Sequence, residues 1–393
     1  MNKQKRAILL VFAASLAVAN TSVSGMKPSS TQQKTPQRYQ YPSDCLNDML
    51  SEARRQRQAI RIVGVHDALS ARIVQQQHGL KVLREQQETD DSSSTPSSVV
   101  PVAPMGLFVS GFGVSAARLG KPDMSIVTRY EQEDTARNII QAVSSSSSSS
   151  NFNPPPVIVD GDTGFGGTSN VRETIRRMAA TKAAAITIED QVFPKKCTYM
   201  AGSGINIVSR QDATDRIKTA LAAKQEAEEA DGNRISVIAR TDCRMGLGLD
   251  EAIERCLAFQ ELGADIVYAE NLQDKDEYTT LRKAMIGGGD AGDLSSFSTS
   301  DVAPMILAQF QTGKEGQRLY PVDEVSSMGY EITLYGVTGL QATVSALESV
   351  AAELFNDDSG GIVSSTPLSS LNEIKDVVGF SDLDAFEQKY GCT

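Results

Sequence analysis

Short apolar runs alternate with longer amphipathic segments along the chain from about residue 44 onward. Each apolar run has the length and β-branched composition of a buried strand, and most are followed by apolar residues at helical spacing. The predicted strands are 60–65, 107–110, 157–159, 183–188, 235–239, 265–269, 304–308 and 331–335. This alternation predicts a parallel α/β sheet. Eight units without a switch-point signature favour a closed (β/α)8 TIM-type barrel over an open sheet.

Helix signals fit the same plan. A helix at 44–58 precedes the first strand, a second starts at Asp67 and runs to roughly Gln76, and a third covers 129–143. Further along, Ser209 with Asp212 three residues later marks a helix start, as do Asn170 with Glu173 and Asp250. Residues Leu371 to Tyr390 read as extra helices beyond the barrel.

Three low-complexity segments interrupt this plan, at 84–104, 144–156 and 286–301. They are rich in Ser, Pro, Gly and acidic residues, so they have little apolar surface to bury in a core. We therefore predict a barrel over 44–356 with these segments as insertions, followed by a tail over 357–393.

The N-terminus has a different character. Basic residues precede the apolar run Ala7 to Val18, and small residues follow, so 1–19 reads as a secretory signal peptide. Residues 20–43 are basic and contain no acid before the predicted barrel, which is typical of a transit-like leader. Together they predict entry into the secretory pathway, with a complex plastid, secretion or an endomembrane lumen as destinations.

Acidic residues gather where predicted strands end. Asp160 and Asp162 follow the third strand and Glu189 follows the fourth, with Asp123 on an earlier loop. The carboxyl ends of parallel strands meet at one face of a barrel, and clustered carboxylates there suit Mg²⁺ or Mn²⁺. The alternative is that these acids cap helices or pair with Arg172 and Lys195 at the rim.

Other polar residues follow strands as well. The thiol of Cys197 stands beside Lys195 and Lys196, whose charges favour ionisation and make it usable as an acid or base. Arg240 and Glu270 end two later strands and could hold a substrate carboxylate, and His66 could line the site; rim salt bridges are the alternative for the charged pair. Glycines after the second strand match a dinucleotide fingerprint only formally, and they more simply allow backbone N–H groups to approach a ligand carboxylate.

Composition narrows the classes of function. The net charge of −11 argues against nucleic-acid binding, which needs a concentrated basic surface. Apolar runs stay below about 18 residues, so no membrane-spanning helix is expected. The five cysteines lack the close spacing of a disulfide scaffold or a zinc site. A small carboxylic acid is the expected partner.

Taken together, several motifs resemble the isocitrate lyase/phosphoenolpyruvate mutase superfamily over about residues 46–390. They are Val65-His66-Asp67-Ala68-Leu69-Ser70-Ala71-Arg72, Ser110-Gly111-Phe112-Gly113, Asp160-Gly161-Asp162-Thr163-Gly164-Phe165-Gly166, Glu189-Asp190-Gln191, Lys195-Lys196-Cys197, Ala239-Arg240-Thr241-Asp242 and Val378-Gly379-Phe380. Each motif alone is short, but the joint set is highly specific.

This resemblance implies a barrel whose eighth helix is exchanged between subunits, usually in tetramers. It implies Mg²⁺ on Asp160, assisted partly through water by Asp162, Glu189 and Asp123. In the lyase branch a mobile loop carries the lysine and a cysteine that acts as the catalytic acid. The resemblance also implies that the substrate carboxylate is held by Ser110, Gly111, Phe112 and Arg240. Thr198, Glu270 and Gln309 would surround the substrate. The catalytic residues would be Lys195, Cys197 and Arg240.

The sequence also departs from the superfamily pattern. Thr198-Tyr199 stands where Gly-His is usual, Gln309 where Asn is usual, Thr312 where Glu is frequent, and Gln341 where methylisocitrate lyases have Arg. Fewer cationic contacts favour a substrate with fewer carboxylates than a tricarboxylate. The resemblance thus predicts a Mg²⁺-dependent lyase for a 2-hydroxy or 2-oxo dicarboxylate. Phosphonopyruvate mutation, oxaloacetate hydrolysis and a metabolite-binding barrel without turnover stay open as alternatives.

Overall fold

The structure, a computed structural model, describes residues 39–90, 104–145, 153–198, 206–288, 301–313, 318–356 and 367–391. The predicted signal peptide and most of the leader lie outside these residues. The same holds for most of each predicted insertion and for Tyr199. These predictions therefore stay predictions. In the described part of the chain, no helix is long and apolar enough to cross a membrane.

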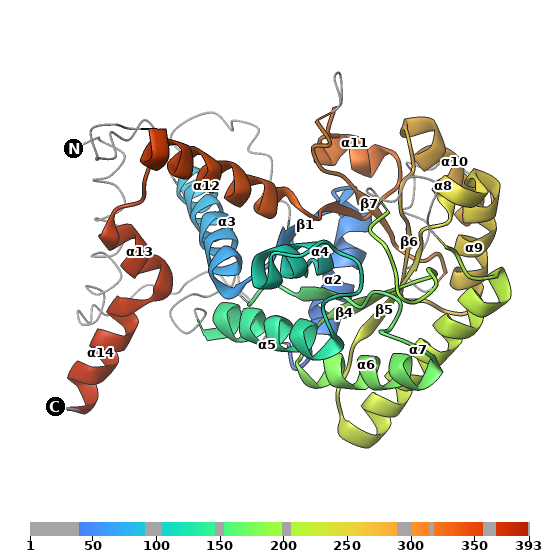
Figure 1. Cartoon of the computed structure of the whole chain (residues 1–393), viewed down its shortest axis with the longest axis horizontal. Helices are drawn as coiled ribbons and strands as arrows, with labels where there is room; N and C mark the ends of the chain where they lie inside the picture. The colour runs from blue at the N-terminus through green and yellow to red at the C-terminus, as the bar shows by residue number, and fades with distance from the viewer. Residues whose placement is uncertain are drawn as a thin grey trace, which may run out of the picture. The chain divides into compact units, whose positions relative to one another are not determined.

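The predicted closed barrel is confirmed: parallel strands pair in chain order and β8 pairs with β1 (Figure 1). The strands are β1 (Ile60–Val65), β2 (Met105–Val109), β3 (Val157–Asp160), β4 (Ala185–Glu189), β5 (Ser236–Thr241), β6 (Ile266–Ala269), β7 (Met305–Ala308) and β8 (Ile332–Tyr335). Each predicted strand overlaps an observed one, because the β-branched runs that suit a strand are also the runs that the barrel buries.

Helices surround the barrel and extend beyond it. They are α2 (Pro42–Gln56), α3 (Ala68–Asp90), α4 (Gly111–Val114), α5 (Arg129–Ser145), α6 (Thr168–Ala180), α7 (Arg210–Asp231), α8 (Arg244–Leu247), α9 (Leu249–Glu261), α10 (Lys275–Met285), α11 (Val322–Ser327), α12 (Thr338–Asn356), α13 (Leu371–Val378) and α14 (Phe380–Tyr390), with one π-helical turn, η1 (Ser115–Leu119).

Two helix predictions need correction. The helix expected to end near residue 76 continues to Asp90, so it takes up the start of the insertion expected at 84–104 and includes His78. The segment is rich in Leu, Lys, Arg, Glu and Gln, which favour helix, and Gly79 alone does not end it. Helix α6 begins after Gly167, whose N–H donates to Asn170 Oδ1 at 3.2 Å. Asn170 therefore caps the helix from its third position.

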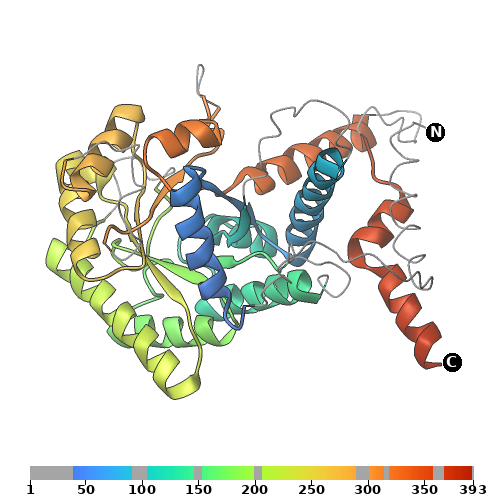
Figure 2. The ribbon, with the colours of Figure 1, turned by 180° about the vertical axis from the view of Figure 1, so that it is seen from behind.

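Side-chain direction alternates along the strands and separates two apolar layers. One set fills the barrel, for example Ile158, Ile238 and Ile266, and packs with Leu46 and Leu50 of α2. The other set, such as Val159 and Val237, faces the surrounding helices. The filled positions near the strand starts, together with α2, close the N-terminal end of the barrel (Figure 2).

A buried ion cluster reinforces this closed end. Glu331 Oε1 accepts hydrogen bonds from Arg54 Nε of α2 at 2.6 Å and from Arg282 of α10 at 2.8 Å. The other oxygen, Oε2, accepts from the backbone N–H of Met305 at 2.8 Å. One carboxylate therefore ties α2, α10 and β7 to the strand that it precedes, and it pairs with both buried guanidinium groups.

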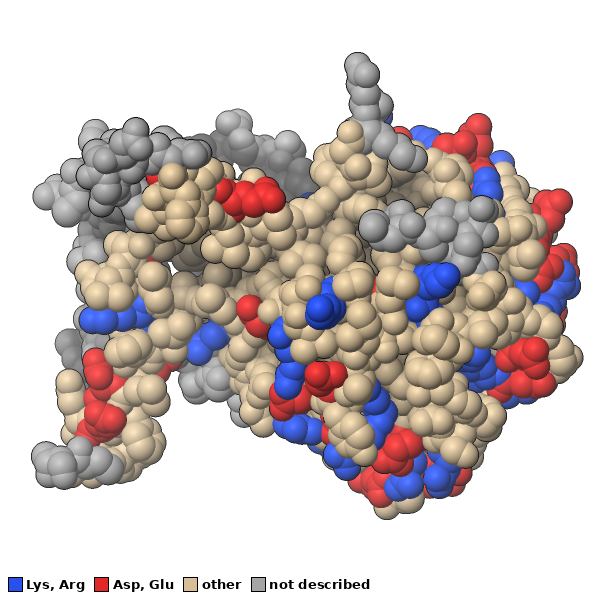
Figure 3. Space-filling model, viewed as in Figure 1, with Lys and Arg blue, Asp and Glu red and all other residues tan. Residues whose placement is uncertain are grey.

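Helix α12, which follows the eighth strand, leaves the barrel after its first turn (Figure 1). Its residues 341–349 are all exposed, and the helix also exposes large apolar side chains, with Leu347 64% and Phe355 88% exposed. Charged side chains of both signs intermingle over α6 and α7 in Figure 3, whereas the surface over α12 is mostly uncharged. The place of an eighth barrel helix is therefore not taken by α12 of the same chain.

Candidate active site

The alternation that fills the barrel also carries polar side chains into its C-terminal end. Two residues beyond Ile158 comes Asp160, two beyond Ile238 comes Arg240, and four beyond Ile266 comes Glu270. Glu189 ends β4 in the same phase, four residues after Ala185. Because each step of two keeps the inward direction, the apolar interior continues into a charged one.

Asp160 is held by three donors. Its Oδ1 accepts hydrogen bonds from Thr187 Oγ1 at 3.0 Å and Asp162 N at 3.2 Å, and its Oδ2 accepts from Gly111 N at 3.2 Å. Burial opposes ionisation of this carboxyl, but the charges of Lys195 and Arg240 outweigh it and hold its pKa below the usual value. Asp160 is thus a fixed, ionised carboxylate.

Lys195 reaches into this acidic cluster from the loop after β4. Its Nζ lies 2.9 Å from both Asp123 Oδ2 and Asp162 Oδ1. Burial disfavours the ammonium, yet Asp162, Glu189 and Asp123 more than compensate and raise the pKa of Lys195. Burial raises the pKa of Asp162 to about 7, with Asp160 and Asp123 adding to the rise and Lys195 opposing it.

Glu189 differs from the other acids. It is buried, and neither of its carboxylate oxygens has a hydrogen-bond partner among the described residues. The nearest cation in the ion pairs is Arg240, with NH1 3.5 Å from Oε2. Burial raises the pKa of Glu189 well above its usual value, although Lys195 opposes this. An orphaned, buried carboxylate in such a cluster is suited to a cation or ordered water.

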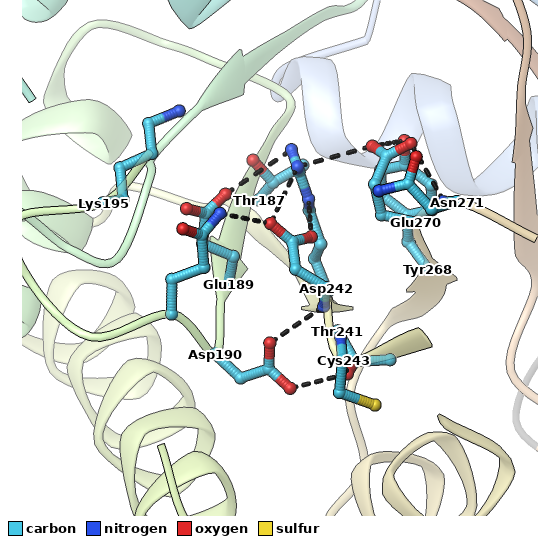
Figure 4. A network of polar contacts seen from close by, with 12 residues as sticks. Thr187, Glu189, Asp190, Lys195, Thr241, Asp242, Cys243, Tyr268, Glu270 and Asn271 are labelled. Carbon is cyan, nitrogen blue, oxygen red and sulfur yellow. Dashed lines mark hydrogen bonds and ion pairs between the residues drawn. The ribbon is translucent and has the colours of Figure 1, made fainter. Parts of the chain in front are cut away.

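Arg240 is oriented by a neighbour on its own strand. Asp242 accepts from Arg240 Nε at 2.6 Å and from NH2 at 3.1 Å, a bidentate pair. Glu270 Oε2 lies 3.4 Å from NH2 and accepts from the Tyr268 hydroxyl. Figure 4 shows Asp242 between Glu189 and Glu270. Asp242 and Glu270, which directly follow β5 and β6, therefore hold the guanidinium of Arg240 in place. We call this arrangement the Arg240 clamp.

Sequence reasoning assigned no role to the residues behind this clamp. Asp190 Oδ1 accepts from Asp242 N at 2.8 Å, and its Oδ2 accepts from Arg255 NH1 at 2.9 Å. Gln191 Nε2 donates to Asp242 Oδ2 at 2.6 Å. The sequence pointed to these residues only through the polar run Glu189-Asp190-Gln191 at the end of a strand. All three side chains are buried, although successive residues point in opposite directions.

The predicted carboxylate-binding loop lies next to the acids. Ser110 Oγ accepts from Gly113 N at 3.1 Å and caps the short helix α4. A Cβ at Gly111 would stand 3.0 Å from Asp160 Oδ2, so a side chain at this position would have to displace that carboxylate. Phe112 is half-buried, and Cys197 and Thr198 are buried on the loop after β4. Cys197 N donates to Asp123 O at 3.0 Å, which joins the thiol's backbone to the same cluster.

Gln309 is placed differently from the other predicted substrate contacts. It follows Leu307 in the outward phase of β7, and its amide is engaged with Tyr320 N and O at 2.7 and 3.0 Å and Thr333 Oγ1 at 2.9 Å. It therefore holds the loop before α11. Gln341 donates to Gln311 O from the exposed start of α12. A shift of one residue in strand phase decides which side of the barrel a side chain serves.

The carboxylates of this cluster provide the oxygen ligands that a hard divalent cation such as Mg²⁺ prefers. Within the described ranges, no three carboxylate, imidazole or thiol groups are arranged to ligate one ion directly. Mg²⁺ commonly takes one or two protein carboxylates and completes its shell with water and substrate oxygens. Asp160 would supply a direct ligand, and Asp162, Glu189 and Asp123 would hold its waters.

A (β/α)8 barrel with buried acids, a clamped guanidinium and a thiol at its C-terminal end is the setting of an enzyme active site. A sequence model described as "Phosphoenolpyruvate phosphomutase" matches residues 50–355, so the chain belongs to this family within the isocitrate lyase/phosphoenolpyruvate mutase superfamily. The predicted resemblance is confirmed, and the chain is an enzyme of this superfamily.

Relatives with named activities cover most of the chain. It is 31% identical to 2,3-dimethylmalate lyase of Eubacterium barkeri, over 72% of this chain and 86% of the relative. It is 27% identical to 2-methylisocitrate lyase of Halalkalibacterium halodurans, over 88% and 94%. The structure of phosphonopyruvate hydrolase in complex with oxalate and Mg²⁺ matches with a TM-score of 0.64 and 25% identity, over 89% of this chain and 99% of that chain.

The raised pKa of Asp162 predicts a pH dependence of stability. Below its usual value near 4, both folded and unfolded states carry the proton; between there and about 7, the unfolded state ionises first. The contribution of this group to stability is therefore present at low pH and lost as the pH rises through about 7. Asp162→Asn removes that loss, so its Tm relative to wild type should rise by on the order of 5 °C between pH 4.5 and 8.

Melting curves in a chelating buffer at both pH values check this. Any fixed cost of the substitution cancels, because only the change of the difference with pH matters. Asp231→Asn, at a partly exposed ion pair, is the matched control and should show a much smaller change. A difference for Asp162→Asn that is constant with pH would contradict the raised pKa.

Proposed function

We propose that this enzyme is a Mg²⁺-dependent lyase that cleaves a carbon–carbon bond in a 2-hydroxy or 2-oxo dicarboxylate of the substituted-malate type. The products would be a 2-oxo acid and a second carboxylate. The observation that carries the proposal is that one segment, Lys195 to Cys197, is bound to the acidic cluster that faces Arg240. An anion clamp, a metal-suited carboxylate group and a thiol thus share one end of the barrel.

The residues have distinct proposed roles. Arg240, oriented by Asp242, would bind a substrate carboxylate beside the short segment Ser110 to Phe112. Mg²⁺, when bound, would supply positive charge to the oxygen on C2 and the adjacent carboxylate. As the C2–C3 bond breaks, the hydroxyl proton would pass from C2–OH to a carboxylate of the acidic cluster, and the hydroxyl oxygen would become the carbonyl of the 2-oxo acid. The electron pair of the broken bond would stay on the departing carbon. Cys197 would then protonate the carbanion left on the other fragment.

The relatives support the same chemistry. Two of them are named as lyases for branched hydroxy acids, and the phosphonopyruvate hydrolase structure contains oxalate and Mg²⁺. Oxalate is a planar chelator that resembles a 2-oxo acid. Among the described residues, Lys195 and Arg240 are the buried cations paired with this cluster, and so small a number favours a dicarboxylate over a tricarboxylate.

The first prediction from this proposal concerns the metal. Turnover should require Mg²⁺ or Mn²⁺, and Asp160→Ala should lower it by about 10³-fold or more, because the ionised carboxylate would be the direct ligand. Asp→Ala at the exposed residue Asp215 is the control and should leave turnover unchanged. Release of 2-oxo acid from substituted malates measures both. Full activity in excess chelator would exclude the metal.

The second prediction separates lyase from mutase chemistry through Cys197. Cys197→Ser should reduce carbon–carbon cleavage by roughly 10²–10⁴-fold, the usual contribution of a positioned acid, while oxalate affinity stays close to wild type. Cys45→Ser is a matched control, since the two cysteines are 8% and 9% exposed and Cys45 lies in α2. Cleavage that persists in Cys197→Ser would remove the thiol from the mechanism. A wild type that rearranges phosphonopyruvate and cleaves no dicarboxylate would contradict the lyase assignment.

The third prediction concerns assembly. We propose that the apolar, exposed α12 packs on a second copy of the chain, in a homotetramer as the superfamily resemblance implies. Light scattering should give about four times the mass of one chain, and Leu347→Glu together with Phe355→Glu should shift the mass to smaller species. Glu replacement of two exposed polar residues of α7, Gln225 and Gln211, is the control. A wild-type monomer would contradict this proposal.

A further inference from the structure

Gln191 joins two parts of the site that have no strand in common. It lies directly after β4 and is 1% exposed. Its Nε2 donates to Asp242 Oδ2 at 2.6 Å, and its Oε1 accepts from the backbone N–H of Lys196 at 3.1 Å. Leaving either end of this buried amide without its hydrogen bond would cost free energy, so Gln191 holds its two partners at a fixed distance from each other.

On the Asp242 side, Gln191 supports the anion clamp. The Asp242 oxygen that accepts from Gln191 also accepts from Arg240 NH2 at 3.1 Å. The same carboxylate is fixed through its backbone, since Asp242 N donates to Asp190 Oδ1 at 2.8 Å. The guanidinium therefore lies one carboxylate away from the Gln191 side chain.

On the loop side, Gln191 holds the peptide between the two residues with proposed chemical roles. Lys196 itself is exposed, but its N–H lies between the buried side chains of Lys195 and Cys197. Two further backbone N–H groups of this segment bind a different loop: Lys195 N donates to Ser125 Oγ at 2.8 Å and Cys197 N to Asp123 O at 3.0 Å. Gln191 instead connects the segment to β5 through Asp242.

The backbone of Gln191 is itself fixed at the base of the loop. Val192 N donates to Asn206 O at 2.7 Å and Val208 N donates to Asp190 O at 3.0 Å, which closes the two ends of the loop against each other. Arg216 donates to the carbonyl of Gln191 at 2.8 Å. The side chain thus starts from a rigid point and reaches both partners.

We propose that Gln191 is a positioning residue that sets the placement of Cys197 relative to the Arg240 clamp. Its catalytic consequence rests on the proposed function, whereas its effect on the loop does not. Substrate bound by Arg240 would meet the thiol in a fixed geometry only while this amide bridge is intact. Without the Gln191 side chain, Arg240 would still be bound by Asp242, but the segment Lys195 to Cys197 would no longer be connected to Asp242.

The test compares Gln191→Met with Gln132→Met in the full chain. Gln132 is also 1% exposed and donates from its side chain to Val109 O and Asp160 O, but it contacts neither Asp242 nor the loop in the hydrogen bonds of the structure. Alkylation of Cys197 by iodoacetamide, followed by peptide mass spectrometry, reports on the loop without any turnover. Gln191→Met should raise this rate by roughly 5- to 30-fold, and Gln132→Met should not.

Kinetics give the second readout. Gln191→Met should lower kcat by roughly the same factor while the Kd for oxalate changes by less than about threefold, because Asp242 still orients Arg240. In the Cys197→Ser background, Gln191→Met should cost little more, since its effect acts through the thiol. For Gln132→Met the effects should multiply with those of Cys197→Ser.

Gln191→Glu provides a second variant of nearly the same size. Beside the buried carboxylate of Asp242 its own carboxyl group should stay protonated, so it can still donate to Asp242 Oδ2 and accept from Lys196 N–H. Alkylation of Cys197 should therefore stay close to wild type. The proposal would be overturned if folded Gln191→Met were alkylated at the wild-type rate. It would also be overturned if Gln191→Met and Gln191→Glu showed an equal increase. If wild type shows no cleavage of any dicarboxylate, the proposed function fails while the alkylation rates still decide whether Gln191 positions the loop.

Discussion

The closed barrel depends on one geometric constraint, the two-residue period of side-chain direction in its strands. Once Ile158, Ile238 and Ile266 point inward at the lower end, the inward direction two and four residues later belongs to Asp160, Arg240 and Glu270. The apolar filling and the charged site are therefore one continuous stack. A strand that slipped by a single residue would lose both at once, because it would turn apolar residues to the helices and acids away from the site.

Charge balance is the second requirement at this end of the barrel. Burial works against every ionised group there, so the acids tolerate one another only because Lys195 and Arg240 lie among them. The balance is uneven: Asp160 is kept ionised, whereas the pKa values of Asp162 and Glu189 are raised. Acids whose pKa values are shifted by burial and by specific charged partners are common at active sites.

The site and the opposite end of the barrel are stabilised in different ways. At the closed end both carboxylate oxygens of Glu331 accept hydrogen bonds, from Arg54, Arg282 and a backbone N–H of the same chain. At the open end Glu189 keeps two oxygens without hydrogen bonds in the described part of the chain, and α12 exposes an apolar surface. The Glu331 carboxylate at the closed end thus has its hydrogen-bond partners within the chain. The unsatisfied carboxylate and the exposed apolar side chains occur where we propose that cation, substrate and a second copy of the chain bind.

The sequence by itself determined the barrel and the strand positions, and it showed which acids and cations follow the strand ends. It could do so because β-branched runs, a period of two and polar residues at strand ends are local properties of the chain. Tertiary structure decided what depends on phase and on contacts between distant segments. Gln309 belongs to the outward phase of β7 and so binds Tyr320, and α3 continues past the expected loop. Gln191 meets Asp242 only because β4 and β5 are neighbours. A side chain's partners across 51 residues of sequence follow from strand pairing in three dimensions, which no local pattern records.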